Sequence, residues 1–128
     1  MEITLKKKII VNQEDIDDIM CTALEGGITY WCMSAQSCME SEWMKKNNIE
    51  YCSEIISRGG DIALTTLDGD YILTLTSFYR GLQKLIDESG EYYLEQTNDG
   101  YALKTSEIDA DIADLIIQYA IFGKLVYA

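Results

Sequence analysis

The first half of the chain repeats apolar residues at the three- and four-residue spacing that is typical of amphipathic helices. Asn12 suits a helix N-cap, and the pattern behind it predicts a helix over residues 13–25 that ends at a pair of glycines. The same spacing predicts a second helix over 28–39, whose end is left open, and a third over 49–56 that another glycine pair stops. We therefore expect the first half to be mostly helical.

Apolar and polar residues alternate over much of the remaining chain, which is the two-residue period of strands. Before the first helix, Ile3, Leu5 and residues 9–11 predict one strand or a pair of strands. The second half predicts, in order, a hairpin over 62–75 with its turn at Asp68 and Gly69, a helix capped by Thr74 or Thr76 and ending near Ser89, a hairpin over 92–103, a helix capped by Asp109 and ended by Gly123, and a strand over 125–127.

Together these elements predict one α+β domain over residues 1–128, helix-rich in 12–58 and built from a hairpin plus helices in 61–128. We expect four to five helices packed on a small antiparallel sheet. A chain of 128 residues is long enough to form a hydrophobic core without disulfides or an obligatory partner.

Charge and residue inventory remove several classes of function. The chain has 22 acidic residues against 10 Lys and Arg, so its net charge of -12 opposes direct binding to nucleic acid or anionic membranes. It has no histidine, which excludes a Ser-His-Asp triad, a Cys-His dyad and every His-ligated metal site. We therefore expect a protein that is not an enzyme. The N-terminal residues lack the apolar region of a signal peptide, so we expect a cytoplasmic protein with reduced cysteines.

Two groups of carboxylates are candidates for binding a partner: Glu14, Asp17 and Asp18, and Asp109, Asp111 and Asp114. Acidic residues at helix N-termini complement the helix dipole, which is one interpretation. The other is that they steer the protein toward a strongly basic partner, such as a protein built to hold nucleic acid. Nine Tyr and two Trp, against two Phe, favour half-buried core edges, and interface anchors are the alternative.

The four cysteines Cys21, Cys32, Cys38 and Cys52 are the candidate ligands of a structural zinc ion. On one continuous helix, Cys32 and Cys38 would lie about 9 Å apart along the axis, too far to share a tetrahedral ion. A zinc site therefore requires the second predicted helix to break near residues 34–37, where two serines disfavour helix. Buried free thiols are the alternative, and a catalytic or redox thiol lacks a histidine base to activate it.

Several segments together resemble a known family. These are 16–20, 23–32 (ALEGGITYWC), 56–60 (ISRGG), 73–75 with Phe78, Gly81 and Leu82, and 113–123, which includes IIQYA and a final Phe-Gly pair. The combination resembles a family of small acidic proteins from phages and prophages of Gram-positive bacteria. The segment 33–48, which includes Cys38, and Cys52 depart from the family pattern, which favours joint recruitment of these two cysteines, as a metal site would need.

One group of that family is similar to anti-CRISPR inhibitors of type II RNA-guided nucleases. The resemblance implies a phage-encoded, non-enzymatic inhibitor that acts in the cytoplasm of the infected bacterium. It would bind a basic host nuclease of a type II CRISPR-Cas system and obstruct the loading of target DNA. The alternative is a structural or accessory phage protein-interaction domain without inhibitory activity, whose charge only maintains solubility.

Overall fold

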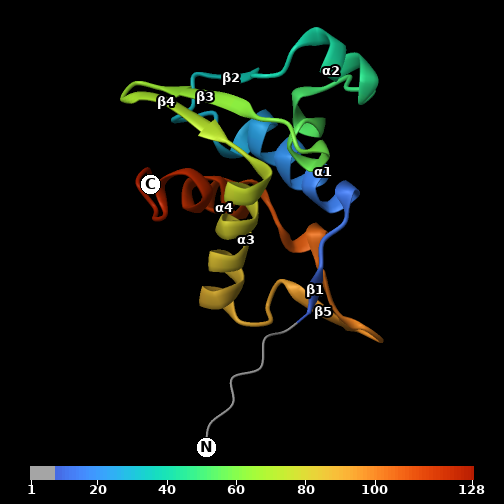
Figure 1. The fold of residues 1–128 in the computed structure, drawn as a ribbon. Helices are drawn as coiled ribbons and strands as arrows, with labels where there is room; N and C mark the ends of the chain where they lie inside the picture. The colour runs from blue at the N-terminus through green and yellow to red at the C-terminus, as the bar shows by residue number, and fades with distance from the viewer. Residues whose placement is uncertain (1–7) are drawn as a thin grey trace, which may run out of the picture.

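The computed structural model describes residues 8–128, and these form the α+β architecture that the sequence predicts (Figure 1). The expected strand residues Ile3 and Leu5 lie outside the described residues. The strands form two small sheets. In one, β1 (Ile9–Ile10) pairs in parallel with β6 (Gly100–Leu103), which pairs antiparallel with β5 (Leu94–Thr97). In the other, β2 (Ser34–Ser37), β3 (Ile62–Thr66) and β4 (Gly69–Leu73) are antiparallel.

Three of the helices begin at the N-terminal caps that the sequence predicts. The helices are α1 (Gln13–Thr22), which continues as the π-helical turn η1 (Ala23–Gly27), α2 (Ser41–Lys46), α3 (Leu75–Ser89) and α4 (Ala110–Phe122), with 3-10 turns η2 (Cys52–Glu54), η3 (Ile56–Arg58) and η4 (Thr105–Glu107). The side chains of Asn12, Thr74 and Asp109 each accept a hydrogen bond from a backbone N–H in the first turn of the helix that follows. These caps satisfy N–H groups that would otherwise lack a partner.

The second predicted helix is wrong. Residues 28–33 form a turn closed by the Cys32 amide, which donates to the Ile28 carbonyl at 2.8 Å, and the chain then runs as strand β2 beside β3. Trp31, Cys32 and Ala35 fit a helical stripe, but they fit an extended segment beside a sheet equally well. Strand pairing decides the outcome, because β3 offers its edge and the serines favour extended backbone. The required break at 34–37 is therefore present.

Two smaller predictions also need correction. The predicted helix over 49–56 is replaced by the short 3-10 turns η2 and η3. The Glu54 carboxylate accepts from the Glu50 and Tyr51 amides at 2.8 Å each and fixes a tight turn there. Residues 125–127 form no strand. Their amides bond to a side chain of α4, which the next section describes.

In the hairpin β3–β4, the alternation of residues along strand β3 determines which side chains are buried. Ile62, Leu64 and Thr66 alternate inward with exposures of 4% or less, as the two-residue period predicts. Thr66 pairs with Gly69, so Leu67 and the residue after it form the loop, one position earlier than predicted. Leu75 begins α3 and does not extend the strand.

Helices α3 and α4 make the most extensive contact of any two elements. Gly81 allows this close approach, because a Cβ atom there would collide with the Ile116 carbonyl oxygen and lie 2.8 Å from the Ala120 amide nitrogen. The contact buries Phe78, Leu82, Leu85, Ile116 and Ile117 with exposures of 2% or less. Burial of this kind is the main stabilising contribution to the fold.

We predict that Gly81→Ala lowers the free energy of unfolding by about 1–3 kcal/mol, because two backbones must separate to admit the methyl group. Gly26→Ala is the control, since a Cβ at Gly26 meets nothing within 4 Å. Urea unfolding followed by circular dichroism measures both. Equal midpoints for the two variants would contradict the close-approach argument.

Candidate protein-binding surface

The most polar part of the interior is the carboxylate of Asp114, which is 7% exposed. Its oxygens accept hydrogen bonds from the Tyr30 hydroxyl at 2.5 Å, the Trp31 indole N–H at 2.7 Å and the Gln118 amide at 2.9 Å. Three donors compensate the loss of water around the charge. Asp114 therefore joins the turn after η1 to the middle of α4.

Gln118 extends this arrangement to the end of the chain. Its side-chain oxygen accepts from the amides of Val126 and Tyr127 at 2.8 Å each, and its nitrogen donates to the Tyr127 carbonyl at 3.0 Å. The Tyr127 ring stacks on Trp31 with centroids 5.3 Å apart and planes 4° apart. The C-terminal residues are thus held on the body by side-chain hydrogen bonds and ring stacking, and not by a strand.

This network corrects the role expected for Asp114, which is not part of an exposed acidic surface. Asp17 is also largely occupied: its carboxylate accepts from the Ser57 hydroxyl at 2.5 Å and forms an ion pair with Arg58 at 3.1 Å. Asp109 is exposed but caps α4 through the Ile112 amide at 3.0 Å. The sequence did not distinguish these roles, because acidic residues near the start of a helix give the same pattern whether they face the interior or the solvent.

The remaining predicted carboxylates, Glu14, Asp18 and Asp111, are exposed. Asp18 and Thr22 of α1 line a hollow of about 290 Å³ together with Thr105, Ser106 and Ile108 from the segment before α4. Ile108 lies between the exposed residues Glu107 and Asp109. Asp18 of the first acidic group therefore lies on the same hollow as residues 105–108, the segment that leads into the second acidic group.

Tyr30 links the buried network to this acidic region. Burial of the hydroxyl and its hydrogen bond to Asp114 raise the pKa of Tyr30 to about 12, and the nearby charge of Asp111 adds to the rise. The hydroxyl therefore points inward as a donor, while the residue as a whole is 56% exposed. Tyr30 presents its ring outward beside Asp111.

The other aromatic residues divide between the two interpretations that the sequence left open. Trp31 and Tyr93 are buried and belong to the core. Tyr51, Tyr79 and Tyr92 are among the large exposed side chains, at 68%, 42% and 63%. Trp43, Tyr101 and Tyr127 are partly buried at the edge of the core.

The cysteines are divided between two places. Cys32 is buried and donates to the Ser34 carbonyl at 3.2 Å. Cys21 and Cys52 line one hollow of about 280 Å³, and burial and then the charge of the exposed Cys38 raise the pKa of the Cys52 thiol. Within residues 8–128, no group of three or more Cys, Asp or Glu side chains is placed to hold a metal ion.

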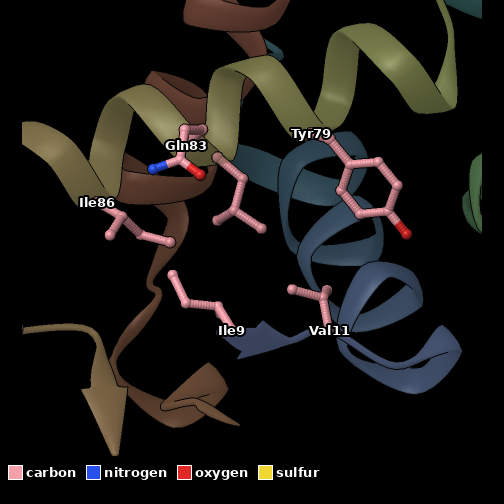
Figure 2. A pocket seen from close by; sticks show the side chains of 6 residues that line it. Ile9, Val11, Tyr79, Gln83 and Ile86 are labelled. Carbon is pink, nitrogen blue, oxygen red and sulfur yellow. The ribbon is translucent and has the colours of Figure 1, made fainter. Parts of the chain in front are cut away.

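A further hollow of about 300 Å³ lies between β1 and α3 (Figure 2). Ile9 and Val11 point from the first strand region toward Tyr79, Gln83 and Ile86 on the helix. The side chains that line it are apolar apart from the Gln83 amide and the Tyr79 hydroxyl, and they include no carboxylate and no thiol.

Comparisons with protein-family models, curated proteins and solved structures found no match. The resemblance to the phage family consequently stays a prediction. Among the described residues, no helix is both long and apolar enough to cross a membrane.

We predict that Asp114→Asn lowers the free energy of unfolding by about 2–4 kcal/mol, because the new amide group would face N–H and O–H donors that lose a charged acceptor. Asp111→Asn, an exposed residue three positions away, should change stability by no more than about 0.5 kcal/mol. Urea unfolding monitored by tryptophan fluorescence reports on the site directly, because Trp31 donates to Asp114. Similar losses in both variants would show that the buried hydrogen bonds contribute little.

Zinc binding by Cys21, Cys32, Cys38 and Cys52 also stays a prediction, and it requires Cys32 to leave its bond to Ser34 and join the other thiols. Elemental analysis of untagged protein that has never met a chelator is the test. About one zinc per chain, lost together with thermal stability on chelation, is the expected result for a structural site. Four thiols titrating freely in folded, zinc-free protein would reject it.

Proposed function

We propose that the protein is a phage-encoded, non-enzymatic inhibitor that binds a basic type II RNA-guided nuclease and obstructs the loading of target DNA. The observation that carries the proposal is that the exposed Asp18 of α1 and residues 105–108, which lead into the acidic start of α4, line one hollow. Glu14 and Asp18 on α1 and Asp111 in the first turn of α4 are exposed and carry negative charge. The family resemblance supplies the nuclease as the partner.

The chemistry of the partner fits this surface. Such nucleases hold the guide-target duplex in a positively charged channel, where lysine and arginine side chains contact phosphates. Exposed carboxylates meet the same side chains and steer the inhibitor to the channel. The net charge of -12 gives this steering long range at low salt. The alternative, a phage protein-interaction domain without inhibitory activity, predicts no such dependence on particular carboxylates.

The test uses a guide-loaded type II nuclease from a host of such phages and measures association by biolayer interferometry. We expect the double variant Asp18→Lys/Asp111→Lys to associate at least tenfold more slowly than wild type at low salt, because the charge facing the partner is reversed. The control Glu95→Lys/Asp99→Lys makes the same change in net charge on the β5–β6 hairpin and should alter association by no more than about threefold.

Two further readouts complete the experiment. Wild-type association should slow steeply between low and physiological salt, since exposed charges are screened. Circular dichroism should show that both double variants fold, because all four replaced side chains are exposed. Absence of binding to any guide-loaded type II nuclease, or equal effects of the two double variants, would contradict the proposal.

A further inference from the structure

Large exposed apolar side chains gather near the loop of the β3–β4 hairpin and the C-terminal residues. Leu67 is 88% exposed, Met33 is 60% exposed and Tyr30 is 56% exposed. They surround a hollow of about 330 Å³ that Trp31 and Tyr127 also line. We call these five residues the hairpin-tip patch. Clustered exposed apolar groups around a hollow mark interaction sites more often than scattered ones do.

Hydrogen bonds to neighbouring segments hold residues of the hairpin-tip patch in place. The Met33 amide donates to the Thr65 carbonyl at 2.8 Å, and the Tyr127 hydroxyl donates to the Asp68 carboxylate at 2.7 Å. Tyr30 is fixed through its hydroxyl to Asp114. A surface whose parts are already fixed loses little conformational entropy on binding, so the contacts it makes contribute more fully to affinity.

The charges around the hairpin-tip patch select the occupant. Asp68 lines the hollow, and Asp70 is exposed two residues further along β4. Asp111 is also close enough to Tyr30 for its charge to contribute to the raised pKa of that hydroxyl. An apolar hollow that Asp68 lines and that has further carboxylates nearby matches an apolar side chain that lysines or arginines flank. A second copy of this chain would bring a further net charge of -12 to the same place.

We infer that the hairpin-tip patch is the docking site for an exposed apolar side chain, flanked by lysine or arginine, on the surface of the basic partner. This inference rests on the proposed function and divides the interface into two parts. The exposed carboxylates of α1 and of the first turn of α4 steer association, and the hairpin-tip patch holds the complex together once it has formed. Apolar contacts at the centre of interfaces act mainly on dissociation, and charges at the rim act mainly on association.

The experiment compares dissociation of the Met33→Ser/Leu67→Ser variant with that of wild type from the guide-loaded nuclease. We expect dissociation to be faster by about 30-fold or more, the scale of a lost interface hot spot, with association changed by no more than about twofold. Ile10→Ser is the control, because Ile10 is 46% exposed on β1, away from the hairpin tip in Figure 1. It should dissociate like wild type.

Each other result has a definite meaning. If wild type binds and the double variant dissociates at the wild-type rate, the inference is wrong while the proposed function stands. If wild type does not bind the nuclease, the proposed function and the inference both fail. Light scattering tests whether a second copy of this chain occupies the patch instead. A wild-type dimer that Leu67→Ser converts to a monomer would assign the patch to that second copy and overturn the inference.

Discussion

The carboxylate of Asp114 loses almost all contact with water when the chain folds. The segments around it must therefore supply hydrogen-bond donors that replace the lost water. None of the ion pairs among residues 8–128 includes it, so hydrogen bonds alone compensate its desolvation. Breaking one such bond leaves a buried charge with too few donors, which costs more than the bond itself contributes. Tyr30, Trp31 and Gln118 must therefore occupy these positions together.

This requirement couples segments that are far apart in the sequence. The turn after η1 and the middle of α4 are about eighty residues apart, yet Asp114 joins them with charge-assisted hydrogen bonds. Gln118 then fixes the chain end, and Tyr127 covers Trp31 and reaches Asp68 on the β3–β4 loop. The surface beside the hairpin tip owes its shape to this chain of contacts. The residues on which the family resemblance rests thus include the two segments that meet at Asp114.

Much of the fold could be predicted from the sequence where local signals and tertiary contacts agree. The caps at Asn12, Thr74 and Asp109, the long helices α3 and α4 and both hairpins have strong periodicity and clear ends. The helix predicted over 28–39 is wrong because the apolar spacing there suits a helix and a strand equally, and only pairing with the edge of β3 distinguishes the two. The strand expected at 125–127 failed for a related reason: the Gln118 side chain supplies the acceptor that a neighbouring strand would supply.

The candidate site was harder to predict, because identical side chains serve different purposes according to which way they face. Asp114, Asp111 and Asp109 occupy one helical turn and its cap, yet they are respectively buried, exposed and bound to a backbone amide. Net charge therefore overstates the number of carboxylates that can contact a partner. Sequence spacing alone does not distinguish the buried carboxylates from the exposed ones, because that depends on which elements α4 packs against. The signal that was available lies in the partners: a Tyr-Trp pair is rich in donors, and Asp and Gln spaced four apart on a helix share one face. Matching these donors to possible acceptors in the sequence would have predicted that Asp114 is buried. The other carboxylates would then have remained as candidates for contacting a partner.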